Sequence, residues 1–425
     1  MFDMLISLLM ILYAVKKILN VQMMTIVDFV VISYGGTYGL VPLINSRLGG
    51  GLQFSDTVTI EYGIGIFLFI SGMYFISYIA PFKTVKELTN IVPIDVKMTF
   101  VIFLIVSVIR LVMALVYGSF ASFSDDSDAL NGYFQLFLCL EITLACALWI
   151  LLAKCIFDDR GFLSKFLFML EIFYIFAWGR RVFFVFVCIL AFFFRFSKRW
   201  HERGLFEYLS IAFFSLIFVF LIMVFQPLRV KLGELRDQGG GLNFAAASEQ
   251  ILESDPGNII EKDSINIKER DPIYAFHKRI IESQETQSPL FGGAMLAAFI
   301  QLTPSFLFFK NVEKVYSKMT IQRYYGMSEI DTAGSWPAVG QADFGLCGTF
   351  LYGCLFAIIL KIFEAISWRF KNSVIGVASL GALFFVAGSV EQGPEEVFGL
   401  LRDLAIFSIF VMITRFIART PSGYD

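Results

Sequence analysis

The sequence predicts an all-α membrane protein: a polytopic transmembrane helical bundle of about 11 spans with one large extracytoplasmic loop. Of the 425 residues, 57% are hydrophobic and only 16% are charged, whereas about a quarter of an ordinary soluble chain is charged. The apolar residues also gather in runs that approach the roughly 20 residues a helix needs to cross a bilayer. The formal net charge of −2 offers no basic footprint, so nucleic acid is not an expected partner.

Eleven apolar runs are the candidate spans, and each is a separate helix in this prediction. They are 2–19, 22–44, 62–80, 98–117, 133–153, 162–178, 182–194, 205–225, 345–367, 373–390 and 396–414. The first run lacks a basic start and a small-residue cleavage site, so we expect a retained helix and not a signal peptide. The runs divide the chain into helices 1–8 (1–225), a large loop (226–344), and helices 9–11 with a tail (345–425).

The direction of the helices follows from the short basic turns, because Lys and Arg in such turns collect in the cytoplasm. With the amino terminus outside, all the strongly basic turns fall on the inner side. Their residues are Lys16, Lys17, Lys83, Lys86, Lys97, Lys154, Arg160, Lys165, Arg195, Lys198, Arg199, Arg203, Arg369, Lys371, Arg415 and Arg419. The acidic turns 124–128 and 391–396 fall on the outer side. We therefore expect a multi-pass membrane protein whose loop 226–344 lies on the non-cytoplasmic side of the bilayer.

The large loop has helical segments of its own. Asp271-Pro272 is typical of a helix start, and the pattern that follows predicts one apolar face with His277, Lys278 and Glu282 on the other. A second short helix is expected over 311–319. The apolar segment 290–309 contains glycines and Pro304, so we interpret it as partly buried or re-entrant and not as a twelfth span.

Cysteine spacing predicts neither a disulfide framework nor a metal site. All six cysteines lie in or beside apolar runs, and none lies in the loop 226–344. Small apolar packing residues are the expected role. We predict no cofactor and no metal.

The turn Gly179-Arg180-Arg181 is the most informative polar feature. It lies between two apolar runs, on the side where positive charge is disfavoured, and arginine near hydrocarbon is costly. Two interpretations stay open: a structural role, with Arg180 reaching lipid headgroups or pairing with Glu141 or Glu171, or the binding of an anion such as a diphosphate. Further cations predicted on the outer side are Arg229, Lys310, Lys314 and Arg323. Together with Arg180 and Arg181 they form the candidate anion-binding set.

Candidate general bases come from the same loop. An imidazole suits proton transfer near neutral pH, which makes His277 a candidate, although an ordinary surface histidine remains the alternative. Glu282 and Asp343 are the carboxylates that we carry forward, and Glu285 and Asp331 are not distinguished from them by spacing.

Three short strings and the order of the helices resemble a known family. The strings are Trp178-Gly179-Arg180-Arg181; Leu302-Thr303-Pro304-Ser305 followed by Lys310; and Ala338-Val339-Gly340-Gln341-Ala342-Asp343-Phe344-Gly345-Leu346-Cys347-Gly348. With about eleven helices and a long exported loop before the last three, the chain resembles the bacterial oligosaccharide repeat-unit polymerases. These are the O-antigen polymerases, which are related to the O-antigen ligases.

The resemblance implies a metal-independent glycosyltransferase of polysaccharide and lipopolysaccharide biosynthesis, located in the bacterial inner (plasma) membrane with the loop 226–344 periplasmic or extracellular. It would transfer a growing glycan from undecaprenyl diphosphate to another lipid-linked oligosaccharide repeat unit at the outer face of the membrane. The arginines and lysines of the anion-binding set would hold the diphosphate, and His277, Glu282 or Asp343 would activate the acceptor hydroxyl. The implied partners are the lipid-linked oligosaccharide, the lipid bilayer, a chain-length regulator protein and a flippase.

Two other functions stay open at this point. An O-antigen ligase would use the same architecture. A transporter or flippase of lipid-linked sugars is a second alternative, although the sequence lacks the repeated halves that are common in transporters.

Overall fold

A computed structural model describes residues 23–40, 54–92, 96–117, 132–158, 162–177, 273–302, 315–327 and 334–419, together with residues 8, 9, 12, 13, 16, 17 and 42. Every regular element in these ranges is helical, and the only β-type pairing there is an isolated bridge between Thr25 and Thr84. The predicted all-α class is therefore confirmed for the described part of the chain. Three helices are long and apolar enough to cross a membrane: α4 (Asp56–Ile79), α16 (Trp336–Arg369) and α18 (Pro394–Arg419, over Pro394–Thr414).

The other described helices either coincide with predicted apolar runs or are shorter helices between them. They are α2 (Ile26–Tyr34), which continues as the π-helix η2 (Gly35–Leu40), α5 (Val85–Asn90), α6 (Val96–Tyr117), α7 (Gly132–Asp158), α8 (Phe162–Ala177), α13 (Ile273–Gln284), α14 (Gly293–Leu302), α15 (Ser317–Tyr324) and α17 (Val374–Gly388). The predicted spans 182–194 and 205–225, and most of 2–19, lie outside the described residues.

Two helix positions differ from the sequence prediction. The helix expected over 62–80 begins at Asp56, because the hydroxyl of Ser55 accepts a hydrogen bond from the Val58 N–H and so caps an earlier start. The helix expected over 311–319 instead runs over Ser317–Tyr324. Helix α14, within the apolar segment 290–309, has only 10 residues, about half of what a span needs.

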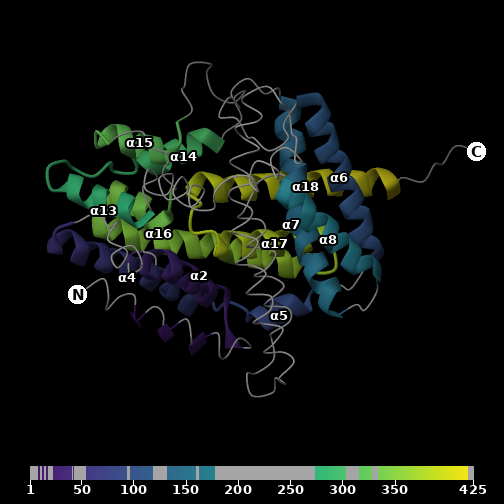
Figure 1. Cartoon of the computed structure of the whole chain (residues 1–425), viewed down its shortest axis with the longest axis horizontal. Helices are drawn as coiled ribbons and strands as arrows, with labels where there is room; N and C mark the ends of the chain where they lie inside the picture. Colours follow the sequence, from purple (N-terminus) through teal and green to yellow (C-terminus); the bar gives the residue numbers. More distant parts are fainter. Residues whose placement is uncertain are drawn as a thin grey trace, which may run out of the picture.

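Glycines let α4 and α16 pack backbone against backbone. A Cβ added at Gly72 of α4 would lie 2.3 Å from the Phe350 carbonyl oxygen, and one at Gly353 of α16 would lie 2.1 Å from the Phe69 carbonyl oxygen. Small residues of this kind are typical of helix contacts inside membranes, where close approach provides van der Waals attraction. Figure 1 shows α4 alongside α16, with α6, α7 and α8 gathered at the other side of the molecule.

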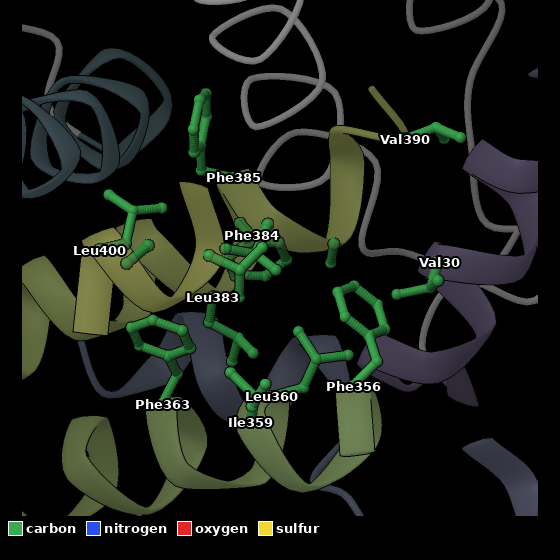
Figure 2. Close-up of a cluster of buried hydrophobic side chains, with 14 of the residues drawn as sticks. Val30, Phe356, Ile359, Leu360, Phe363, Leu383, Phe384, Phe385, Val390 and Leu400 are labelled. Carbon is green, nitrogen blue, oxygen red and sulfur yellow. The ribbon is translucent and has the colours of Figure 1, made fainter. Parts of the chain in front are cut away.

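The core lies where α16 and α17 face each other. Phe356, Leu360 and Phe363 of α16 are at most 1% exposed. Figure 2 shows them pointing toward Leu383 and Phe384 of α17. Burial of side chains this large stabilises the fold by about 1.5–3 kcal/mol each. These two helices therefore form the centre on which the others pack.

The outer surface is apolar as well. Phe67 of α4 is 69% exposed, Val108 of α6 is 57% exposed, and Ile409 of α18 is 58% exposed. Further exposed large apolar residues follow at helical spacing on the same helices: Ile60, Ile64, Leu104, Ile105, Leu111, Phe410 and Ile413. Such continuous stripes are expected where a helix contacts lipid and not water.

Three of the described basic turns, those of Lys17, Lys83 and Arg369, lie close together. The bridge between Thr25 and Thr84 joins the start of α2 to the start of α5. Lys361, near the end of α16, donates a hydrogen bond to the Pro81 carbonyl oxygen at 2.6 Å. The basic residues that these turns bring to one end are Lys17, Lys83, Lys86, Arg369 and Lys371. Which side of a membrane this end occupies remains a prediction from the sequence.

Candidate functional site

The candidate site lies at the opposite end of α4 and α16, where α16 is broken. Phe344 (φ −142°, ψ 18°) and Gly345 (φ +62°, ψ −147°) interrupt the helical conformation. A Cβ at Gly348 would lie 2.0 Å from the Gly340 carbonyl oxygen, so the segment before the break packs directly on the segment after it. Glycine is required at residue 345, because its positive φ is strained for other residues. The string Ala338–Gly348, on which the resemblance partly depends, therefore forms this break.

Asp343 joins the broken helix to α14. Its carboxylate accepts hydrogen bonds from the backbone N–H groups of Ala294 (2.9 Å) and Met295 (3.0 Å), in the first turn of α14. The Tyr352 hydroxyl also donates to it. A carboxylate is stabilised at a helix amino terminus by the unpaired N–H groups and the helix dipole. Asp343, predicted as a candidate base, thus lies in the site and caps another helix there.

Two glutamines connect α4, α13 and α16. The Gln341 amide nitrogen donates to the Glu61 carboxylate at 3.0 Å and to the Gln284 side-chain oxygen at 2.9 Å. The Gln284 amide nitrogen donates back to the Gln341 backbone carbonyl at 2.7 Å and contacts the Tyr325 hydroxyl at 3.0 Å. Glu61 is only half-buried. Gln341 therefore fixes the carboxylate of a residue that is only partly buried.

His277 lies on the inner face of α13, and the predicted solvent-facing position of His277 and Lys278 is wrong. His277 is fully buried, with the edges of the Tyr62 and Tyr38 rings at centroid distances of 5.4 and 6.1 Å. Burial, aided by the neighbouring Lys278 charge, lowers the pKa of His277 to about 3. The imidazole is therefore neutral at physiological pH and, in this arrangement, is no proton acceptor for an exposed substrate.

Lys278 is buried beside it, against α4. Its ammonium donates to the Thr59 hydroxyl at 3.3 Å. It also lies 5.0 Å from the ring centroid of Tyr62 and 5.6 Å from that of Phe54. A cation over aromatic faces is stabilised electrostatically, which explains why a charge is tolerated here. The predicted apolar face of α13 (Ile273, Phe276, Ile280 and Ile281) is buried as expected. The exposed placement of Lys278 was wrong because α4 supplies aromatic partners that the sequence of α13 alone does not reveal.

Several buried polar atoms near the broken helix have no hydrogen-bond partner among the described residues. They are both ring nitrogens of His277, the Tyr34 hydroxyl, the Trp336 indole nitrogen and the Gln341 side-chain oxygen. Leaving such a group unpaired costs roughly 1–3 kcal/mol. Aromatic contacts link members of this cluster. The Tyr34 ring, for example, stacks on the Tyr38 ring with ring centroids 5.7 Å apart. This cluster is a place where water or the hydroxyl groups of a ligand would be stabilised.

Only two of the other predicted site residues, on α13 and α15, lie in the described ranges. Glu282 is exposed on α13 and Arg323 is exposed on α15. The remaining members of the candidate anion-binding set lie outside the described residues: Arg180, Arg181, Arg229, Lys310 and Lys314. Within the described ranges, no group of three or more His, Cys, Asp or Glu residues could hold a metal ion.

A buried ion network at Arg110 was missed by the sequence analysis. The Arg110 guanidinium contacts Glu141 at 2.7 Å and Glu171 at 2.9 Å. The Trp149 indole donates to Glu171 at 2.9 Å. The two carboxylates considered as structural partners of Arg180 are thus both bound to Arg110. A charged residue inside the apolar run 98–117 was the available signal, because such residues are rare and need partners.

Glu61 and the glutamines were also missed. The predicted span began at residue 62 and so left Glu61 in a loop, although the Ser55 cap places it inside α4. Gln284 and Gln341 carry no local signal, because each is identified only by the other across the structure.

Comparison with known proteins identifies no relative. A scan against models of protein families, a search of curated proteins and a search of solved structures each found no match. The site is therefore interpreted from its own geometry.

Proposed function

We propose that this chain is a membrane glycosyltransferase that polymerises lipid-linked oligosaccharide repeat units. Two points support the proposal. Three short strings and the helix order resemble the oligosaccharide repeat-unit polymerases, and the longest of those strings forms the broken helix on which the site is built. The single observation that carries the proposal is the half-buried Glu61 carboxylate, held by Gln341 at the end of an apolar bundle.

In this reaction Glu61 acts as the general base. It takes the proton of the acceptor sugar hydroxyl, whose oxygen attacks the anomeric carbon of the growing glycan. The bond from that carbon to the diphosphate oxygen breaks, and undecaprenyl diphosphate leaves. Base catalysis of this kind contributes about 10²–10⁴-fold. Gln341 orients the carboxylate, and Asp343 is a positioning residue that fixes the broken helix to α14.

The charge that develops on the diphosphate needs fixed cations. Arg180, Arg181, Arg229, Lys310, Lys314 and Arg323 are the proposed set, with Arg180 and Arg181 as an arginine fork that donates paired hydrogen bonds. Among the earlier base candidates, Glu282 is the alternative to Glu61, because it is exposed and lies on the adjoining helix.

The apolar surface next to Glu61 suits a polyprenyl chain. Ile60, Ile64 and Phe67 form an exposed stripe along α4, with exposed fractions of 42%, 40% and 69%. The stripe begins beside Glu61 and continues along the helix at the spacing of one face. A substrate with an apolar tail and a saccharide head would thus contact both surfaces of α4.

Deletion of the gene in its host distinguishes the proposed functions. A polymerase deletion leaves single repeat units on the final acceptor, whereas a ligase deletion leaves the acceptor without glycan. A transporter deletion leaves lipid-linked repeat units on the inner leaflet. Long glycan chains in the deletion strain would refute polymerisation.

The base assignment is tested with Glu61→Gln, which keeps a hydrogen-bond acceptor for Gln341. We expect at least about a 100-fold loss of chain extension at an unchanged amount of membrane-inserted protein. Asp56→Asn is the matched control, because Asp56 is an exposed carboxylate on the same helix. Normal chain length in the Glu61 variant would transfer the role to Glu282.

Transport of a lipid-linked sugar is the second candidate, and one observation favours it. Discontinuous helices hold the substrate sites of many transporters, and α16 is discontinuous at Gly345. The Arg110 network also places ionisable groups inside apolar helices. The deletion experiment separates this function from polymerisation.

A further inference from the structure

A second surface, of basic and aromatic side chains, lies at the end of α4 and α16 that is remote from Glu61. There, α4 ends at Ile79 and α16 ends at Arg369. The Lys83 ammonium lies 5.1 Å from the ring centroid of Trp368. Trp368 is 42% exposed and Tyr78 is 87% exposed. Amphipathic aromatic side chains beside lysine are typical of the level of lipid headgroups at a membrane surface.

The cations of this surface outnumber the nearby described carboxylates, Glu364 and Glu87. Lys86, Arg369 and Lys371 are exposed. Glu364 is occupied by the Lys361 ammonium at 2.5 Å and by the Lys83 backbone N–H at 3.1 Å. Glu87 caps α5, because its carboxylate accepts hydrogen bonds from the backbone and side chain of Thr84. The surface therefore has an excess of positive charge that faces outward.

The segments that carry these charges are fixed to one another. Thr84 and Glu87 form a capping box at the start of α5, which stabilises this short helix. The Lys361 ammonium donates to the Pro81 carbonyl at 2.6 Å, and Val85 N–H donates to the Met24 carbonyl at 2.7 Å. The backbone segments that carry these cations are therefore held in place before an anion binds, which lowers the entropy cost of binding.

We propose that this basic end, formed by Lys83, Lys86, Arg369 and Lys371 with Trp368, binds the headgroup of an anionic phospholipid. The cations meet the phosphate, Trp368 packs at the headgroup level, and the acyl chains lie along exposed apolar residues of α16 such as Ile362 (42% exposed). Each basic residue near an anionic membrane surface contributes about 1 kcal/mol, which is roughly fivefold in affinity. The proposal is independent of the reaction proposed at Glu61.

The test uses the full-length protein in a neutral detergent, with native mass spectrometry as the readout. The protein is titrated with phosphatidylglycerol or, separately, phosphatidylcholine of the same chain length. We expect phosphatidylglycerol adducts at lower lipid concentration, and the double variant Lys86→Gln/Lys371→Gln should weaken them roughly tenfold or more. Equal binding of the two lipids, or an unchanged double variant, would overturn the proposal.

A matched control and a competition experiment sharpen the result. Lys318→Gln/Arg402→Gln removes the same number of charges from α15 and α18, outside this surface, and should leave phosphatidylglycerol binding unchanged. If this control weakens binding as much, the effect is one of net charge and the assignment is wrong.

Inorganic phosphate should not displace the lipid, because it lacks acyl chains. Displacement by phosphate would identify a soluble-anion site instead.

Discussion

Replacement of Gly72 by alanine should separate α4 from α16. The added Cβ would lie 2.3 Å from the Phe350 carbonyl oxygen and 3.0 Å from the Cys354 nitrogen. Both contacts are with backbone, so no side-chain rotation relieves them. A Cβ atom essentially never lies within 3.0 Å of such an atom, and the two helices must therefore move apart by at least 0.7 Å (3.0 minus 2.3) at this point.

The cost follows from the contacts that this movement weakens. A gap of 0.5–1 Å forfeits about a quarter to a half of the dispersion attraction between facing atoms. Overpacking of a tight interior typically costs about 1–3 kcal/mol. Because the clash is with backbone, we expect Gly72→Ala to cost about 2–3 kcal/mol of the free energy of unfolding. At an unfolding entropy of about 2.1 cal/mol/K per residue, 425 residues give about 0.9 kcal/mol/K, so the melting temperature should fall by about 2–3 °C.

Gly36→Ala is the matched control, because a Cβ at Gly36 meets nothing within 4 Å. The two variants and the parent protein would be heated in the same detergent. The soluble, monodisperse fraction would then be measured by size-exclusion chromatography. We expect the Gly36 variant to melt like the parent protein. If the Gly72 variant does so too, the close approach of α4 and α16 is not a feature of the protein.

Three further predictions address the buried polar groups. The unfolded state takes up a proton at His277 below about pH 6.5, whereas the folded imidazole stays neutral down to about pH 3. Stability should therefore fall on acidification between these values by up to about 1.4 kcal/mol per pH unit, and His277→Gln should flatten a plot of melting temperature against pH. Arg110→Gln should lower the free energy of unfolding by about 3–5 kcal/mol, because it leaves two carboxylates of a buried network without their shared cation. Thermal unfolding would measure this loss, and an unchanged melting temperature would contradict it. Tyr352→Phe removes one hydrogen-bond donor to the Asp343 carboxylate and should lower the free energy of unfolding by about 1 kcal/mol. Its local effect should be faster amide hydrogen exchange at the start of α14.

The long apolar helices could be predicted from the sequence because their length is set by the bilayer. A run of about 20 apolar residues has few other structures available, and α6, α7, α17 and α18 follow the predicted runs with shifts of a few residues at their ends, whereas α16 begins at Trp336, well before the predicted run 345–367. The gathering of the basic turns at one end was also predictable, because it depends on charge per turn and not on individual contacts.

The site could not be predicted to the same degree, because its partners are distant in the sequence. Lys278 bonds to Thr59, 219 residues away, and Gln341 bonds to Glu61, 280 residues away. Local periodicity reports how apolar each face of α13 is. It does not report that α4 offers aromatic rings to a buried cation. His277 was placed on the wrong face for the same reason.

The two ends of the α4–α16 pair differ in a way that bears on function. At the basic end, Glu364 is paired with Lys361, so the other cations can bind an external anion without breaking this ion pair. At the other end, α16 is interrupted at Gly345, and polar atoms such as the Trp336 indole nitrogen are buried with no hydrogen-bond partner in the part of the chain that the structure describes. A membrane protein that needed only stability would gain from a continuous helix and apolar side chains here, since unpaired polar groups are costly in such surroundings. Among the described residues, several such atoms lie near the interrupted helix, and this favours the reaction that we propose beside Glu61.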